Sequence, residues 1–173
     1  MRLTDGIVVV RTPTDDDAPA IVDAISSSHR ELSQWLPFAQ AGYSINEALS
    51  WIRGETDPGH PGVIVDPEGR IVGTAGLNLV NEINQMANLG YWLRTDATGH
   101  GWAGRATALV ARYGIETVGL HRIEIIMSVE NEPSRRVAER AGATYEGVLR
   151  GRLLLDGRHH DAHSFSVVPG DLT

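Results

Sequence analysis

The stretch from Leu89 to Ala106 reads LGYWLRTDATGHGWAGRA, and it sets the expectation for the whole fold. Apolar and small residues alternate from Leu89 to Leu93, which predicts a strand because aromatic and aliphatic side chains suit a pleated, half-buried surface. The pattern breaks at Thr95-Asp96-Ala97-Thr98 and resumes at Gly99-His100-Gly101-Trp102-Ala103-Gly104, at the head of a helical run. The stretch therefore predicts a strand, a glycine-rich turn and a helix start.

This order of elements predicts an anion site. Glycine at a helix entrance lets the backbone approach a ligand closely, because no Cβ intervenes. The first amides of a helix lack intrahelical partners, and the helix dipole adds about half a positive charge there. Phosphate is the usual anion at such a place. Simple tight packing also explains two glycines near a helix start, so this alternative stays open. The lysine of a P-loop is missing.

The residue pattern of the stretch narrows these possibilities. Gly90-Tyr91-Trp92-Leu93, a short loop and Gly99-His100-Gly101-Trp102-Ala103 resemble the acyl-CoA-binding core of the GNAT superfamily of N-acetyltransferases. More narrowly, they resemble the Rim-type branch, which acetylates N-termini of ribosomal proteins. The family's pyrophosphate motif, Gln/Arg-x-x-Gly-x-Gly/Ala, falls on Thr98, Gly101 and Ala103, and Thr98 departs from it. The resemblance implies acetyl-CoA as acyl donor, bound by Trp92, Leu93, Gly99, His100, Gly101, Trp102, Ala103 and Gly104.

A second motif follows an apolar run. Glu130-Asn131-Glu132-Pro133-Ser134, with Val137 to Gly142 after it, resembles the family's Asn-x-x-Ser followed by Val-Ala-Glu-Lys-x-Gly. The resemblance then covers the chain from about Ile71 to Asp171. It implies that Asn131 binds the pantetheine arm and that Ser134 lies near the thiol and helps to protonate the leaving thiolate. Alternatively, both residues only cap a helix, as such residues commonly do, and the two roles can coexist.

Composition limits the class of protein. At 173 residues, 42% of them hydrophobic, the chain is expected to form one domain over residues 1–173. The absence of cysteine excludes disulfides, thiolate metal sites and a cysteine nucleophile. The apolar run in MRLTDGIVVV is too short for a signal peptide or a membrane span, so a cytoplasmic protein without a membrane partner is expected.

Charge limits the partners. The net charge is −7 without a basic stripe, which argues against nucleic acid and mildly favours basic acceptors such as amines. All 15 basic residues are arginine, so phosphate charge must be met by arginine and backbone.

The periodicity along the chain predicts the remaining elements. The pattern predicts a first strand over Gly6 to Arg11 and a helix after Thr14 that is weakened at Ser26-Ser27-Ser28. Ser44-Ile45-Asn46-Glu47 matches a capping box. Arg122 to Val129 reads as a central strand buried on both faces, and Asp156-Gly157 marks a hairpin. The order is that of a GNAT fold. We therefore expect an α+β fold with a mixed, mostly antiparallel central sheet of about seven strands, a splayed parallel pair in its middle and helices on both faces.

The resemblance also implies a mechanism. A neutral amine attacks the thioester directly, and the free edge of the Gly90–Leu93 strand binds the acetyl carbonyl. That edge is expected in a gap between the strands ending at Leu93 and at Val129. Many relatives place a glutamate where this chain has Asn88, and some place one near Leu153. Neither is present, so the general base stays open among Glu82, His29, His100 and a water relay.

The acceptor side is less specific. In relatives the N-terminal helices line the acceptor groove, which makes Glu31, Trp35 and Glu82 the substrate-binding candidates, although Trp35 as core packing is an equal alternative. The acceptor is a protein N-terminus or a small amine. Another acyl donor such as succinyl-CoA, with Arg30 or Arg53 at the acyl tail, and a non-catalytic CoA-binding regulatory module remain alternatives. The chain is a monomer or a homodimer.

One histidine-rich segment needs a separate interpretation. His159, Asp161 and His163 share a face of the predicted strand, and histidine is the commonest transition-metal ligand. Relatives hold no metal at this place. We therefore expect no metal, and a polar strand face in which Asp161 is tied to backbone or to an arginine.

Overall fold

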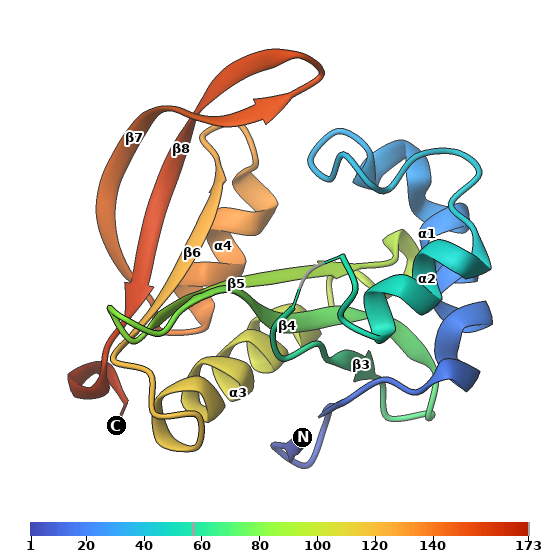
Figure 1. Cartoon of the computed structure of the whole chain (residues 1–173), viewed down its shortest axis with the longest axis horizontal. Helices are drawn as coiled ribbons and strands as arrows, with labels where there is room; N and C mark the ends of the chain where they lie inside the picture. The colour runs from blue at the N-terminus through green and yellow to red at the C-terminus, as the bar shows by residue number, and fades with distance from the viewer. Residues whose placement is uncertain (57, 173) are drawn as a thin grey trace.

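A twisted eight-stranded sheet organises the computed structural model, which describes residues 1–56 and 58–172 (Figure 1). The strands lie in the order β1-β2-β3-β4-β5-β6-β8-β7, and all neighbours are antiparallel except the parallel pair β5 and β6. This arrangement confirms the predicted fold class. The strands are β1 Arg2–Thr4, β2 Val9–Arg11, β3 Val63–Val65, β4 Ile71–Asn81, β5 Met86–Leu93, β6 Arg122–Ser128, β7 Thr144–Leu155 and β8 Arg158–Val167.

The helices begin where the sequence signals place them. Ser44 accepts a hydrogen bond from the Glu47 amide and the Glu47 carboxylate accepts one from the Ser44 amide, which confirms the predicted capping box at α2. Within the described residues, no helix combines the length and the hydropathy that a membrane span needs. The helices are α1 Ala18–Leu32, α2 Ile45–Ile52, α3 Trp102–Glu116 and α4 Glu132–Arg140, with 3₁₀ turns η1 Asp15–Asp17, η2 Thr95–Ala97 and η3 Pro169–Asp171.

Helices cover both faces of the sheet, as expected. Ala87 and Leu89 of β5 belong to the buried cluster that includes Val110 of α3. Trp92, of opposite parity, belongs instead to the cluster that includes Ile21 of α1. Because successive strand residues point to opposite faces, α1 and α3 lie on opposite sides of β5.

The sheet has one strand more than expected, at its N-terminal edge. The predicted first strand, Gly6 to Arg11, is instead the strand β2, and it is preceded by β1. A turn separates them: the Asp5 carboxylate accepts hydrogen bonds from the amides of Ile7 and Val8, both at 3.0 Å, and Gly6 has a φ of +87°. The short apolar run therefore forms half of a hairpin.

The serine run does not weaken α1, which continues to Leu32. The Ser27 hydroxyl donates to the Ala24 carbonyl at 3.2 Å within the helix. Ser28 is buried, and its Oγ accepts a hydrogen bond from the Thr95 amide at 2.9 Å. The hydroxyls thus have partners that helical periodicity alone does not reveal.

The prediction that the Arg122–Val129 strand is buried on both faces is wrong. In β6, Ile123 and Ile125 are buried, whereas Glu124 and Ile126 are only partly buried. Ile126 lines a cavity, and Glu124 pairs with Arg122 at 3.0 Å. One face of β6 therefore carries the core, and the other is only partly covered.

The close approach of β4 to β5 gives a test of the sheet. A Cβ added at Gly73 would fall on the carbonyl oxygen of Trp92 and lie 2.9 Å from the Leu93 Cα, and backbone cannot yield as a flexible side chain does. We expect Gly73→Ala to lower the free energy of unfolding in urea by about 2–3 kcal/mol. Gly170→Ala, whose Cβ meets nothing within 4 Å, is the control and should change it by less than about 0.5 kcal/mol. Equal midpoints for the two variants would contradict the observed pairing of β4 and β5.

Candidate functional site

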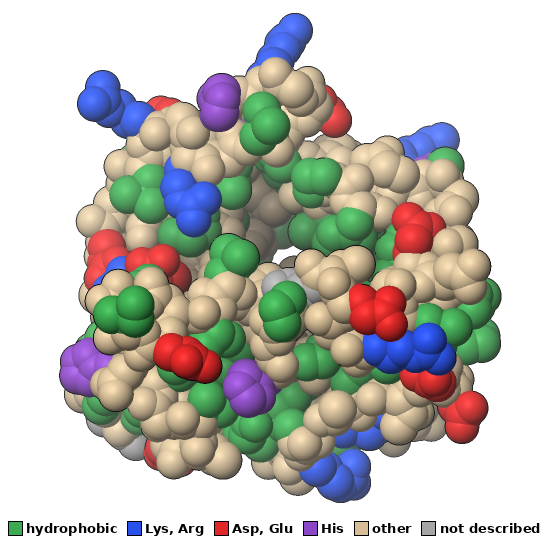
Figure 2. Space-filling model, in the orientation of Figure 1, with side chains coloured by type: hydrophobic (Ala, Val, Ile, Leu, Met, Phe, Trp, Pro, Cys, Tyr) green, Lys and Arg blue, Asp and Glu red, His purple; other side chains and the backbone are tan. Residues whose placement is uncertain are grey.

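A cavity of about 1350 Å³ opens where β5 and β6 diverge. Figure 2 shows it as a deep hollow near the centre of the molecule, with hydrophobic side chains around its mouth. Its walls come from segments far apart in the sequence: α1 and α2 with their connecting segment, β4, β5, the glycine-rich turn, β6, α4 and β7. Concave, mostly apolar hollows with a few convergent polar groups are the usual sites for small molecules.

The divergence of the two central strands forms the floor of the cavity. β5 pairs with β6 only where Met86–Asn88 lie opposite Arg122–Glu124. Beyond this point β6 turns away from β5 (Figure 1). On its other side β5 stays paired with β4 as far as Leu93, and β6 stays paired with β8 as far as Ser128. The edge of β5 from Leu89 to Leu93 that faces β6 therefore has no strand partner among the described residues. The gap lies where the sequence placed it.

The glycine-rich turn presents a row of backbone amides at one end of this gap. Gly99 and Gly101 have φ angles of +86° and +77°, in the left-handed region that favours glycine. Over the part of the chain that the structure describes, none of the six amides from Gly99 to Gly104 donates a hydrogen bond. The first amide to do so is that of Arg105, which donates to the Gly101 carbonyl at 3.2 Å. Unpartnered amides at a helix N-terminus are the backbone chemistry of an anion site.

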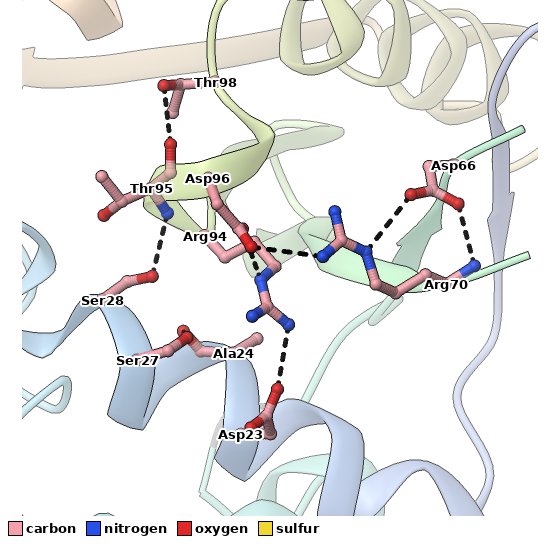
Figure 3. A network of polar contacts seen from close by, with 10 residues as sticks. All are labelled: Asp23, Ala24, Ser27, Ser28, Asp66, Arg70, Arg94, Thr95, Asp96 and Thr98. Carbon is pink, nitrogen blue, oxygen red and sulfur yellow. Dashed lines mark hydrogen bonds and ion pairs between the residues drawn. The ribbon is translucent and has the colours of Figure 1, made fainter. Parts of the chain in front are cut away.

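An ionic network holds the segment that leads from β5 into the turn (Figure 3). The Arg94 side chain donates to Asp96 at 2.6 Å and to Asp23 of α1 at 2.9 Å. Asp96 also accepts from Arg70 at 3.2 Å, and Arg70 contacts the nearly buried Asp66 at 3.4 Å. The network joins α1, the β3–β4 turn and η2, so the turn starts from a fixed position.

Thr98 belongs to the same local scaffold. Its hydroxyl donates to the Thr95 carbonyl at 2.8 Å, while the Thr95 amide donates to Ser28 of α1 (Figure 3). The family motif has glutamine or arginine at this position. Here the Thr98 side chain instead makes a hydrogen bond within the turn. Thr98 also lines the cavity.

His100 is the residue of the turn that the structure does not place at the cavity. Its ring stacks on Trp102 with centroids 4.5 Å apart, and it lines a second, smaller hollow on the other side of the turn. The other residues of the predicted CoA set do line the main cavity: Trp92, Leu93, Gly99, Gly101, Trp102, Ala103 and Gly104.

The second motif brings Asn131 and Ser134 to the opposite wall. Both line the cavity at the start of α4. The Asn131 Oδ1 accepts a hydrogen bond from the Ser134 amide at 3.1 Å, so the capping role that the sequence left open is present. The cap uses the Asn131 Oδ1 and the Ser134 amide, and both side chains line the cavity.

Tyr91 is a site residue that the sequence reasoning missed. Its hydroxyl donates to the Ser134 carbonyl at 2.9 Å and lies 3.0 Å from the Ser134 Oγ. Burial raises the pKa of Tyr91 to about 12, so the phenol keeps its proton at neutral pH. A phenol has a single proton, and this one goes to the carbonyl, so the Ser134 hydroxyl donates to Tyr91. No local pattern joins two residues 43 positions apart.

Two arginines of α4 bring positive charge to the cavity. Arg136 and Arg140 line it, and Arg140 also borders the smaller hollow. Arg136 lies 3.6 Å from Glu132, whereas among residues 1–56 and 58–172 no carboxylate pairs with Arg140. Arg140 lies beside the turn, because a Cβ added at Gly104 would sit 3.2 Å from its Cβ. An unpaired guanidinium thus lies next to the unpartnered amides.

The predicted acceptor residues divide between the cavity and the outer surface. Glu31 and Trp35 line the cavity. Glu82 does not; it lies exposed in the turn between β4 and β5, where its carbonyl accepts from the Gln85 amide.

The residues that the sequence analysis considered for the general base or for another acyl tail also divide between the cavity and other places. Asn88 and Leu153 line the cavity, and Asn88 donates to the Asn78 Oδ1 at 2.7 Å. His29, Arg30 and Arg53 are not among the lining residues. The His29 ring contacts the Ser26 carbonyl at 3.1 Å, and Arg53 pairs with Asp15 at 2.8 Å.

The histidine-rich strand face has internal partners. The Asp161 carboxylate accepts from the Gly151 amide at 2.8 Å, which confirms the predicted tie to backbone. His163 contacts the Tyr145 hydroxyl at 3.3 Å, and His159 contacts the Gly151 carbonyl at 3.3 Å. In the described parts of the chain, no three histidine, aspartate or glutamate side chains gather as a metal site.

Comparison with known proteins agrees with this geometry. Residues 8–144 match the family described as acetyltransferase (GNAT) domain. YdaF of Bacillus subtilis (strain 168), provisionally named a ribosomal N-acetyltransferase, is 30% identical over 168 residues, 93% of this chain and 91% of YdaF. The spermidine N(1)-acetyltransferase of Escherichia coli (strain K12) is 25% identical over 99 residues, 57% of this chain and 53% of that protein. The structure of Mycobacterium smegmatis RimJ in complex with CoA-disulfide superposes with a TM-score of 0.86 at 27% identity, over 99% of this chain and 86% of that one.

Proposed function

Because the chain belongs to the GNAT acetyltransferase family, we propose that it moves the acetyl group of acetyl-CoA to a primary amine, either a peptide N-terminus or a small amine. One observation carries the proposal: six amides from Gly99 to Gly104, without partners among the described residues, lie at the end of the gap between β5 and β6. The relatives are named for ribosomal and for spermidine acceptors, so both acceptor types stay within the proposal.

The backbone and one arginine would hold the donor. We assign the diphosphate of CoA to the Gly99–Gly104 amides, where the helix dipole adds positive potential. Arg140, unpaired among the described residues, supplies the cationic charge that a chain without lysine draws from arginine. Asn131 and Ser134 on α4 and the β5 edge then flank the path of the pantetheine arm into the gap.

The chemistry is a direct transfer. The amine nitrogen forms a bond to the thioester carbon, the carbon–sulfur bond breaks, the nitrogen loses a proton and the CoA thiolate gains one. The unpaired edge of β5 between Leu89 and Leu93 offers backbone amides to the carbonyl oxygen, whose negative charge grows as the nitrogen attacks. The chain thus contributes positioning and polarisation without a covalent intermediate.

Ser134 would protonate the leaving sulfur, and Tyr91 would stabilise the serine oxygen by a hydrogen bond. In the resting arrangement the Ser134 hydroxyl donates to Tyr91, which donates to the Ser134 carbonyl. When Ser134 gives its proton to the thiolate, the Tyr91 hydroxyl, 3.0 Å away, donates a hydrogen bond to the Ser134 oxygen, and Ser134 regains a proton from the solvent that receives the amine proton. Because burial raises the pKa of Tyr91 to about 12, Tyr91 acts as a neutral donor throughout.

For the amine proton we propose a water relay. His29, His100 and Glu82 do not line the cavity, and the Asn78–Asn88 pair cannot take up a proton. Glu31 is an exposed lining residue, suited to attract the acceptor's ammonium at the entrance. Water between the acceptor and this rim would carry the proton to solvent.

Three expectations from the sequence stay proposals: one domain over residues 1–173, a cytoplasmic location, and a monomer or a homodimer in solution. None of them alters the chemistry assigned to the cavity.

Thermal shift with CoA and acetyl-CoA, followed by thiol release with a panel of amines, tests the proposal. The chain has no cysteine, so every thiol detected with a chromogenic disulfide comes from CoA. We expect stabilisation by both ligands and amine-dependent thiol release. Stabilisation without turnover on any amine would instead establish a CoA-binding regulatory module, and no shift with either ligand would end the assignment of CoA.

Two substitutions at Gly101 isolate the charge of the turn. Gly101→Asp places a carboxylate beside the proposed diphosphate, and we expect it to abolish measurable CoA binding in calorimetry. Gly101→Asn is the matched control, because asparagine has almost the same shape, tolerates the left-handed φ and carries no charge. We expect it to retain binding, weakened by about tenfold or less. Equal CoA affinity for the two variants would contradict an anion site at this turn.

The hydrogen bond between Ser134 and Tyr91 predicts that the effects of substituting these two residues on kcat are not independent. Ser134→Ala should lower kcat by about a hundredfold with little change in the Kd for CoA, since the leaving thiolate loses its proton donor. Tyr91→Phe should lower kcat by about tenfold when Ser134 is present and have almost no further effect on Ser134→Ala. If the two losses multiply in the double variant, the residues act separately. If Ser134→Ala leaves kcat unchanged, Ser134 is only part of the helix cap.

A further inference from the structure

We infer that the amine acceptor carries an aromatic or similarly large apolar group, and that polyamines are poor acceptors. The inference rests on the proposed function and specifies the acceptor class for the same cavity. It follows from the side chains that line the acceptor side, from the charge that they bring, and from what those charges already contact.

Aromatic side chains dominate the acceptor side of the cavity. Trp35, Phe38 and Tyr43 come from the segment between α1 and α2, and Trp51 comes from α2. Phe38 and Tyr43 lie with ring centroids 6.2 Å apart, tilted by 56°. Each of these rings offers a large apolar surface, which gains most from a partner of the same kind.

These rings are only partly covered by the protein itself. Trp35, Tyr43 and Trp51 are half-buried, and Phe38 is 48% exposed. An aromatic side chain that served the core alone would be more deeply buried, as Phe165 is at 1%. The wall therefore presents apolar surface that a ligand in the cavity would cover.

The opposite wall matches it. Leu153 and Leu155 of β7 and Met127 of β6 line the cavity across from the helices. A guest between these walls meets apolar side chains on both sides. Polar groups gather instead at the floor, where Asn88 donates to Asn78 at 2.7 Å.

The charge lining the cavity is balanced, although the chain is acidic. Two carboxylates, Glu31 and Glu47, and two guanidinium groups, Arg136 and Arg140, are the charged side chains among its described lining residues. The net charge of −7 therefore lies elsewhere on the protein. A polyamine with several ammonium groups finds no excess of negative charge here.

One of the two carboxylates is already engaged. Glu47 accepts hydrogen bonds from the Ser44 amide at 2.8 Å and the Ser44 hydroxyl at 2.6 Å as part of the α2 capping box. Those bonds hold the pKa of Glu47 below its usual value. Glu31, at the exposed end of α1, accepts one bond from the Thr95 hydroxyl at 3.2 Å. The cavity thus has one carboxylate suited to one ammonium, beside a wall suited to a ring.

Two kinds of molecule have this chemistry. One is a small arylalkylamine, and the other is a peptide N-terminus with an aromatic residue next to its amine. The shared feature is a primary amine within a few bonds of an aromatic group. A panel with both kinds of acceptor identifies the source.

Thiol release by the full chain with acetyl-CoA gives the comparison. The acceptors are phenethylamine, propylamine, spermidine, and two peptides that differ only in phenylalanine or aspartate at the first position. We expect kcat/KM for phenethylamine or for the phenylalanine peptide to exceed that for spermidine and propylamine by about tenfold or more. The better of those two acceptors indicates the source. Spermidine or propylamine at equal or higher kcat/KM would overturn the inference while leaving acetyl transfer intact. Turnover with none of the amines would overturn the proposed function, and the inference with it.

Substitutions at Phe38 locate the specificity. Phe38→Ala should reduce the ratio of the phenethylamine to the propylamine kcat/KM by about tenfold, and Phe38→Glu should lower phenethylamine turnover and raise that of spermidine. Ile83→Ala, at a residue 94% exposed and outside the cavity, is the control and should leave that ratio and the turnover of spermidine as they are. CoA affinity, measured for every variant, should stay within about twofold of the parent chain. Unchanged ratios in both Phe38 variants would show that this wall does not select the acceptor.

Discussion

The short contact between the two central parallel strands is the constraint on which the site depends. β5 and β6 pair over Met86–Asn88 and Arg122–Glu124 and then separate. Each strand keeps its outer partner, β4 or β8, almost to its end, so the sheet stays continuous while its middle opens. A parallel sheet normally pairs and buries these backbone groups. Here the same polypeptide geometry that builds the core leaves a strand edge free to bind a ligand.

The turn after β5 uses backbone in a similar way. Left-handed glycines at 99 and 101 turn the chain into α3, whose first amides have no partner among the described residues, while Arg94, Asp96 and Asp23 fix where the turn begins. In a chain without lysine, these peptide groups and one arginine close by are the groups that we propose to hold the donor's diphosphate. Thr98, which departs from the family motif, keeps the turn closed through its hydrogen bond to the Thr95 carbonyl.

The sequence predicted features that short segments encode. The α2 capping box, the hairpin at Asp156-Gly157 and the glycine turn depend on neighbours in the chain, and each was found in place. Several features that depend on tertiary contact were missed or misplaced. Tyr91 meets Ser134 only because α4 folds over the end of β5, and Ser28 satisfies Thr95 only because α1 crosses the start of the turn. His100 and Glu82 have suitable chemistry, but the backbone directs them away from the cavity.

The amide resonances of the glycine turn report most directly on the central claim. In a ¹H–¹⁵N spectrum of the isotopically labelled chain titrated with CoA, the amides between Gly99 and Gly104 should move strongly downfield as they donate to the diphosphate, while amides inside α1 stay in place. Pantetheine, which has no phosphate, should leave the resonances of the turn amides in place. If saturating CoA shifts other residues and not these six, the turn does not hold the donor, and the assigned reaction loses its basis.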